Sequence, residues 1–159
     1  MNKILILKLI ISLIIPSGLG IIAGLITSQS IPEWYTNLRS PSFNPPNWIF
    51  GPVWTVLYLL MGISLFLVWK QEPNKIRNLA IAVFFIHLLL NIGWSFIFFY
   101  FKAIGIAFIE IIFLWISIVI MLFLFYKVKP IATYINIPYL LWVTFASVLN
   151  GSYYFLNKL

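Results

Sequence analysis

Long apolar runs separated by short polar breaks dominate the pattern along this chain. Asp, Glu, Lys and Arg are absent from residues 9–32, 40–69, 78–101 and 130–157, and residues 103–126 contain only Glu110. Each run exceeds the roughly 20 residues that a helix needs to cross the hydrocarbon core of a bilayer. A spanning strand needs only about 10 residues of alternating polarity, so these uniformly apolar runs favour helices, which satisfy their own backbone groups. The pattern predicts an all-α integral membrane protein, a single domain over residues 1–159 built as a bundle of five transmembrane helices.

The polar breaks set the expected bounds of the helices. We expect helices over about residues 4–27, 48–69, 79–101, 103–126 and 134–156. Residues 28–47 form the one long connection, whereas the break at Lys102 is so short that its two helices must form a tight hairpin. The first run continues to Thr27 without an A-x-A cleavage site, which indicates a retained helix rather than a signal peptide. Gly20 and Gly24 have the GxxxG spacing, for which we prefer close packing inside the bundle to a dimer seam.

Composition and charge support a membrane location and suggest an orientation. Hydrophobic residues make up 63% of the chain and charged residues 8%. The net charge of +7 does not indicate nucleic-acid binding, because the cations lie at segment ends and form no stripe. In a five-span arrangement one side receives Lys3, Lys8, Lys70, Lys75, Arg77, Lys127 and Lys129, and the other receives Arg39, Lys102 and Lys158. The excess of cations on cytoplasmic loops therefore predicts an N-terminus inside and a C-terminus outside. The chain has no cysteine, which excludes thiolate catalysis and cysteine-bound metals.

Polar and aromatic side chains within the spans mark where function is expected, because lipid-facing Leu and Ile need no explanation. Helical spacing places such residues on one face of each of four spans. These faces are Trp54, Tyr58 and Met61; His87, Asn91, Trp94 and Ser95; Ala107, Glu110, Leu114 and Ser117; and Trp142, Ala146, Leu149, Asn150 and Tyr153. If the faces converge, they enclose a cavity with aromatic walls and few polar points. Such a cavity suits a large, flat, apolar ligand.

Several aromatic and polar residues of the chain have a simpler interpretation than ligand binding. Trp34, Trp48 and Trp69 lie near the predicted membrane surfaces, where an aromatic belt is expected. His87 resembles a haem ligand, but no second metal ligand accompanies it, so we prefer a hydrogen-bonded interior group and predict no metal site. Glu110, the one acid within a span, is expected to be paired or functional, which leaves a proton-coupled exporter as an alternative. The odd number of spans and the lack of a repeat argue against that alternative.

A set of ordered motifs between residues 34 and 150 resembles the TspO/MBR family, the tryptophan-rich sensory proteins related to the translocator protein. The matching elements are Trp34-Tyr35, Leu38-x2-Pro41-x-Phe43-x-Pro45-Pro46-x-Trp48, Pro52-x-Trp54-x3-Tyr58-x2-Met61-Gly62, Trp69-Lys70, Asn91-x2-Trp94-Ser95, Phe98-Phe99, Glu110 and Pro138-Tyr139-x2-Trp142-x3-Ala146-x2-Leu149-Asn150. The chain departs from the family pattern at Phe43, Phe96 and His87, where tryptophan, proline and an amide side chain are usual.

The resemblance implies a five-helix bundle, often a homodimer, that binds porphyrins such as protoporphyrin IX and, in some relatives, sterols. It places Trp54, Asn91, Trp94, Trp142, Ala146 and Asn150 in the pocket and the 28–47 loop over it as a lid. Some bacterial relatives promote light-dependent porphyrin degradation, which would make Trp54 and Trp142 catalytic. The proline-rich part of the loop is stiff, so little ordering entropy remains to be lost on binding.

We therefore expect a membrane-embedded binding protein or sensor for porphyrins, which requires no cofactor and has membrane lipid and a hydrophobic small molecule as partners. Light-dependent porphyrin degradation and a small proton-coupled transporter using Glu110 are the alternatives. The expected ligand-binding residues are Trp54, Tyr58, His87, Asn91, Trp94, Glu110, Trp142, Ala146, Leu149 and Asn150. The expected lid and rim residues are Trp34, Arg39, Pro41, Pro45, Pro46 and Trp48, with Arg39 as the partner of a porphyrin carboxylate.

Overall fold

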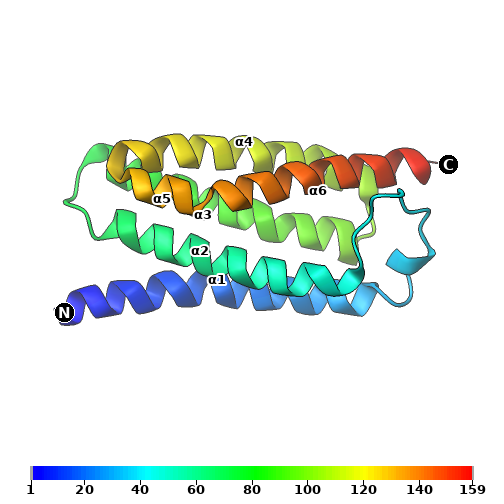
Figure 1. Cartoon of the computed structure of the whole chain (residues 1–159), viewed down its shortest axis with the longest axis horizontal. Coiled ribbons are helices and arrows are strands. Elements are labelled where there is room, and N and C mark those ends of the chain that lie inside the picture. The colour runs from blue at the N-terminus through cyan, green and yellow to red at the C-terminus, as the bar shows by residue number, and fades with distance from the viewer. Residues whose placement is uncertain (1, 159) are drawn as a thin grey trace.

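The computed structural model describes residues 2–158 and contains five long helical spans, each of which runs antiparallel to the span before it (Figure 1). The helices are α1 (Lys3–Ser30), α2 (Phe50–Trp69), α3 (Lys75–Ser95), α4 (Ile104–Val128), α5 (Pro130–Ile135) and α6 (Ile137–Leu156). Single turns are η1 (Tyr35–Asn37), η2 (Asn47–Ile49) and the π-helical η3 (Phe96–Tyr100), and residues 2–158 contain no strand. All five spans are long and apolar enough to cross a membrane, which confirms the predicted all-α class.

The bundle has two distinct ends. The N-terminus, the α2–α3 turn and the α4–α5 junction lie at one end, and the 31–49 loop, the α3–α4 turn and the C-terminus lie at the other, which we call the loop end (Figure 1). The flanks between these ends expose large apolar side chains, including Ile14, Leu89 and Phe113. An apolar outer surface of this kind is suited to lipid. The assignment of the N-terminal end to the inside of the membrane stays a prediction.

Asparagine side chains cap the starts of α1 and α3, and these caps fix where the two helices begin. The Asn2 side chain accepts the Ile4 N–H at 3.3 Å at the start of α1. The Asn74 side chain accepts the Arg77 N–H at 2.9 Å, and α3 begins directly after it, at Lys75, four residues before the predicted residue 79. Asn is a favoured N-cap because its oxygen satisfies a backbone donor that has no intrahelical partner. Helix α3 therefore includes Lys75 and Arg77, charged residues that the sequence pattern assigns to a turn, whereas α1 begins within one residue of its predicted start.

The fifth span is broken, whereas the sequence pattern predicts one helix over residues 134–156. It begins at Pro130 and breaks at Asn136, between α5 and α6. Pro138 in the first turn of α6 has no N–H to continue the hydrogen bonds of α5. Asn136 is completely buried, and its Nδ2 donates to Ala132 O at 3.0 Å and to Ser64 Oγ of α2 at 2.5 Å. The break thus ties the fifth span to α2.

The α3–α4 hairpin is as tight as its sequence suggests. Helix α3 widens into the π-turn η3, and Lys102 adopts a left-handed backbone with φ of 56° before α4 begins. Ala103 N donates to Ile97 O at 3.0 Å across this turn. The widened turn contributes Phe98 and Phe99 to a cluster of aromatic rings under the 31–49 loop.

Small residues let α1 approach α2 closely. A Cβ at Gly62 would lie 2.7 Å from Ser12 O and 3.0 Å from Leu13 Cα, so only glycine fits there. A Cβ at Gly20 would overlap the Tyr58 ring of α2. Gly24 faces open space instead, because a Cβ added there would meet no heavy atom within 4 Å. The predicted GxxxG strip is therefore divided, with Gly20 packed inside the bundle and Gly24 beside a cavity.

Candidate ligand-binding cavity

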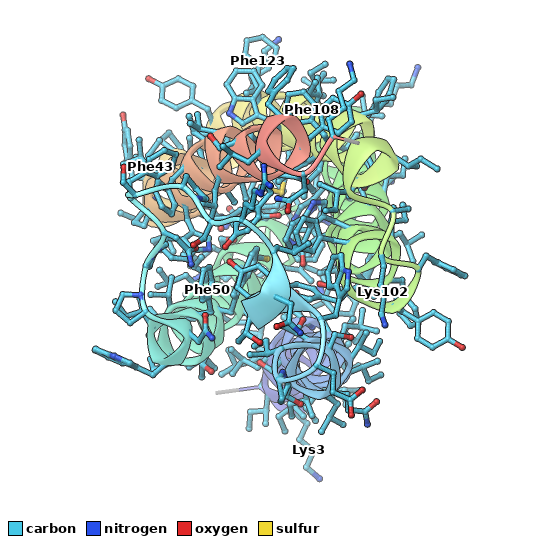
Figure 2. The ribbon with its side chains drawn as sticks, turned by 90° about the vertical axis from the view of Figure 1, so that its right-hand side faces the viewer. Lys3, Phe43, Phe50, Lys102, Phe108 and Phe123 are labelled. Atoms are coloured by element: carbon cyan, nitrogen blue, oxygen red, sulfur yellow. The ribbon has the colours of Figure 1, made fainter. Side chains whose placement is uncertain are left out.

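A cavity of about 550 Å³ lies between α1, α2, α6 and the α3–η3 segment, beneath the 31–49 loop. Figure 2, viewed from the loop end, shows that loop passing in front of the bundle, with Phe43 and Lys102 on opposite sides. Helices α2 and α6 both contribute walls, and α4 contributes none. The volume is within the roughly 300–1,000 Å³ typical of small-molecule sites.

Aromatic rings from three spans form much of the wall. Trp54 of α2 lies 5.6 Å from the Tyr58 ring, and Trp94 of α3 stacks on Phe98 at 5.1 Å. Trp142 of α6 lies 5.9 Å from the Phe50 ring. The predicted residues that line the cavity are Trp48, Trp54, Tyr58, Trp94, Trp142, Ala146, Leu149 and Asn150. The structure therefore brings Trp54, Trp94 and Trp142 to one cavity, and Trp48, which is 74% exposed, to its rim.

The wall formed by α1 was missed by sequence reasoning. Its residues include Ser17, Gly20, Gly24 and Ser28, which repeat at intervals of three or four along one side of the helix. Small side chains leave room for a ligand as readily as they leave room for a neighbouring helix. The GxxxG spacing was the available signal, but the sequence alone indicated only a packing strip.

Asn150 holds the Trp94 indole in place. Trp94 Nε1 donates to Asn150 Oδ1 at 2.9 Å, and Asn150 Nδ2 donates to Ile104 O at the start of α4 at 3.2 Å. The Asn150 side chain is 2% exposed, so both bonds are shielded from water. One amide thus connects α3, α4 and α6 at the level of the cavity.

Asn91 does not line the cavity but forms a hydrogen bond with Tyr58, which does. Its Oδ1 accepts the hydroxyl of Tyr58, and its Nδ2 donates to the Tyr139 hydroxyl at 3.1 Å. Asn91 is buried and does not line the cavity. The structure therefore places it as a support for Tyr58, and a direct contact with a ligand stays a prediction.

His87 and Glu110 also lie outside the cavity wall. The His87 ring is completely buried, with its centroid 4.8 Å from that of Phe84 and 5.8 Å from that of Tyr139. The carboxylate of Glu110 is buried opposite Gly93, at 4.0 Å from the position that a Cβ would take there. Within residues 2–158 neither side chain has a hydrogen-bond partner, and no three His, Cys, Asp or Glu side chains gather as a metal site would require. Of the two expectations for Glu110, paired or functional, the structure does not show a pair within the described residues.

The 31–49 loop is fastened to the bundle at several points. Arg39 exchanges two backbone hydrogen bonds with the Asn157 side chain, at 2.9 and 3.0 Å. Tyr35 is buried against Phe99 and Tyr153, and its hydroxyl donates to Asn44 Oδ1 at 3.0 Å. Burial raises the pKa of the Tyr35 phenol well above its usual range, so the hydroxyl keeps its proton for this bond. The loop is a fixed cover rather than a free segment.

The remaining predicted lid residues do not line the cavity. Trp34 packs edge-on against Phe98 at 5.5 Å between ring centroids, and Arg39 has an exposed side chain. Pro41, Pro45 and Pro46 shape the loop without joining the cavity wall. Among the loop residues, the wall instead includes Tyr35 and Asn47.

Comparison with known proteins indicates the same family as the sequence motifs do. The model of the TspO/MBR family matches residues 12–156. The chain is 40% identical over 158 residues to the tryptophan-rich protein TspO of Chlorobaculum tepidum, covering 94% of this chain and 98% of that protein. It is 37% identical over 155 residues to the protein of that name from Archaeoglobus fulgidus, covering 96% of this chain and 98% of the relative. It is 34% identical over 120 residues to the human translocator protein, covering 74% of this chain and 71% of that protein. The chain belongs to the TspO/MBR family.

Proposed function

We propose that this membrane protein binds a flat, largely apolar molecule of porphyrin size in its cavity and acts as a receptor or sensor for that molecule. The observation that carries the proposal is the cavity of about 550 Å³ with Trp54, Trp94 and Trp142 in its walls. Aromatic rings provide broad apolar contact and favourable ring-to-ring geometry, which suit a planar conjugated ligand. The fixed loop above the cavity reduces the ordering entropy lost on binding.

A titration with protoporphyrin IX tests this proposal. The purified protein in lipid nanodiscs is expected to shift the Soret band and to show quenched tryptophan fluorescence as the porphyrin is added. Trp142→Ala should weaken binding by about tenfold, which corresponds to roughly 1.4 kcal/mol, because one aromatic wall is lost.

Trp115→Ala is the matched control for this titration. Trp115 lies on α4, donates to Thr144 Oγ1 at 2.8 Å and does not line the cavity. Its loss should leave the dissociation constant unchanged. Equal binding by the native protein and by Trp142→Ala would count against the proposal.

The indoles also favour a second candidate function, light-dependent porphyrin degradation. Trp54 of α2 and Trp142 of α6 both line the cavity, so a bound porphyrin would have two oxidisable indole rings within the same wall. Illumination of the complex in air should then produce a new absorbing product, and Trp54→Phe or Trp142→Phe should slow its formation without abolishing binding. A protein that only binds would give the same photobleaching rate as empty nanodiscs. The proton-coupled transporter has less support, because Glu110 lies outside the cavity wall.

A further inference from the structure

Two cations from different helices meet at the last residue of α2, at the end of the bundle that also holds the N-terminus (Figure 1). Lys8 Nζ of α1 donates to Trp69 O at 3.3 Å, and Arg77 Nη2 of α3 donates to the same oxygen at 3.0 Å. Carbonyl groups at the end of a helix have no partner within that helix, so the two side chains cap α2. The shared oxygen also holds two positive charges close together. None of these three residues lines the cavity.

The negative charge available at this junction does not balance the two cations. The carbonyl end of a helix amounts to roughly half an elementary charge. Within residues 2–158 the hydrogen bonds of the two cationic groups reach only Trp69 O and Asn78 Oδ1. Glu72 of the α2–α3 turn is the one acid near this end of the described chain, and it is exposed and accepts no hydrogen bond from Lys8 or Arg77. The junction therefore has an excess of positive charge.

Arg77 is the buried member of the pair and Lys8 is the accessible one. Arg77 is 7% exposed, and its Nε has no hydrogen-bond partner within residues 2–158. Removal of a charged group from water is costly unless an opposite charge compensates for it. Lys8 is half-buried, and an ammonium group has three donors, of which Trp69 O accepts one. The other two can reach a further acceptor outside the bundle.

We propose that the phosphate of an anionic phospholipid binds at this junction, where Lys8 donates to its oxygens and Arg77 provides a second, buried positive charge. A lipid fits better than free phosphate, because Leu7 beside Lys8 is 57% exposed and Ile76 beside Arg77 is 45% exposed. These side chains offer apolar contact to an acyl chain, while Trp69 marks the end of the span, where headgroups lie. A zwitterionic lipid fits less well, because its own ammonium group already balances its phosphate.

Other cations at this end of the bundle lack such an arrangement. Lys70 lies over the Phe66 ring at 5.3 Å, and Lys127 lies over the Phe123 ring at 4.3 Å, each within its own segment. A general excess of cations attracts an anionic membrane surface as a whole. Two cations from different helices that share one oxygen instead predict a discrete site, whose preference for an anionic lipid is lost when one cation is removed.

Native mass spectrometry of the delipidated protein in detergent tests this proposal. Phosphatidylglycerol and phosphatidylcholine with identical acyl chains are added separately, and the dissociation constant of the first bound lipid is measured for each. We expect the native protein to bind phosphatidylglycerol more tightly by about fivefold or more, as one well-placed cation near a membrane surface provides. Lys8→Gln should lose most of this preference. No preference in the native protein would overturn the proposal.

Lys129→Gln is the matched control for Lys8→Gln. Lys129 is an exposed cation between α4 and α5, at the same end of the bundle (Figure 1). Its loss removes the same charge from that end and should leave the preference for phosphatidylglycerol unchanged. An equal loss of preference in both variants would show that overall charge is sufficient, and would contradict a discrete site.

The buried charge is tested at Arg77. Arg77→Lys keeps a cation and should retain the preference for phosphatidylglycerol, whereas Arg77→Gln should lose it. A preference that survives in Arg77→Gln would contradict the role of the buried charge. Should Arg77→Gln fail to fold because α2 loses a cap, the comparison of Lys8→Gln with Lys129→Gln still decides whether the site exists.

A final comparison separates a lipid from free phosphate without any variant. The melting temperature of the native protein in phosphatidylcholine nanodiscs is measured with phosphatidylglycerol added to the bilayer or with inorganic phosphate added to the buffer. A ligand that binds only the folded protein raises the melting temperature, and we expect the rise with the lipid alone. An equal rise with inorganic phosphate would assign the junction to a soluble anion and overturn the lipid site.

Discussion

At the scale of single residues, buried amides organise this cavity more than ionisable groups do. Asn91 connects Tyr58 with Tyr139, and Asn150 connects Trp94 with Ile104 O. An amide has both donor and acceptor and no charge, so it can join two helices inside a bilayer without the cost of burying an ion. The ring positions in the wall depend on these two side chains.

Replacing Asn150 by Leu should destabilise the protein by about 1–3 kcal/mol, because the Trp94 N–H and the Ile104 carbonyl would lose their partners in a buried environment. Thermal unfolding in one fixed detergent measures the loss, and the emission of Trp94 should change with it. Ser152→Ala is the control, since the Ser152 hydroxyl bonds only to Val148 O of its own helix. Equal melting temperatures for Asn150→Leu and the native protein would show that the amide bridge contributes little.

At the scale of elements, α1 serves two purposes with one strip of small residues. Gly20 allows contact with the Tyr58 ring, and Gly24, one turn further, leaves space beside the cavity. The same spacing therefore tightens the α1–α2 interface at one point and forms a ligand wall at the next. Helix α1 contributes to the site although its sequence has neither aromatic nor charged residues at these positions.

The two glycines should respond differently to the same substitution. Gly20→Ala would force the Tyr58 ring to move and should cost about 1–3 kcal/mol of stability, as overpacked cores generally do. It should also weaken porphyrin binding, because Tyr58 lines the cavity. Gly24→Ala meets open space and should change stability by less than about 0.5 kcal/mol. Chemical denaturation and porphyrin titration of both variants provide the comparison, and equal loss in both would argue against the α1–α2 contact described above.

At the scale of the whole molecule, the loop end is closed by contacts between segments that are far apart in the sequence. Arg39 and Asn157 are 118 positions apart, and Ser30 Oγ donates to Phe99 O at 2.9 Å across 69 positions. The Arg39 bonds hold the loop to the end of α6, and the Ser30 bond holds the end of α1, where the loop begins, to η3. Retention of a ligand should therefore depend on residues that never touch it.

Asn157→Ala should release the loop from α6 while leaving the spans intact. We expect faster amide hydrogen exchange over residues 36–46 and a faster dissociation rate for a bound porphyrin, with only a small change in melting temperature. Asn37→Ala is the control, because the Asn37 side chain bonds within the loop to Glu33 O. If exchange in the loop is equally slow in Asn157→Ala and the native protein, the aromatic contacts of Tyr35 alone are sufficient to hold it.

The sequence by itself determined the number of spans, the helical class, the segregation of cations between the two ends and the family. The length of an apolar run and the charges at its ends can be read directly from the sequence, and they decide whether and in which direction a segment crosses a bilayer. The order of the motifs can also be read from the sequence, and it indicates the family. The periodicity also placed Trp54, Trp94 and Trp142 on faces rich in polar or aromatic residues, and the structure brings these three to one cavity.

Only the tertiary structure decided which members of each face line the cavity. His87, Asn91 and Trp94 share one side of α3, yet only Trp94 is in the wall, because Tyr139 of α6 packs against His87 and Asn91. Glu110 was excluded because α4 packs behind α3 and α6, and the small residues of α1 were included because that helix completes the enclosure. Helical periodicity gives the direction of a side chain about its own axis, whereas the rotation and neighbours of the whole helix decide what that side chain meets.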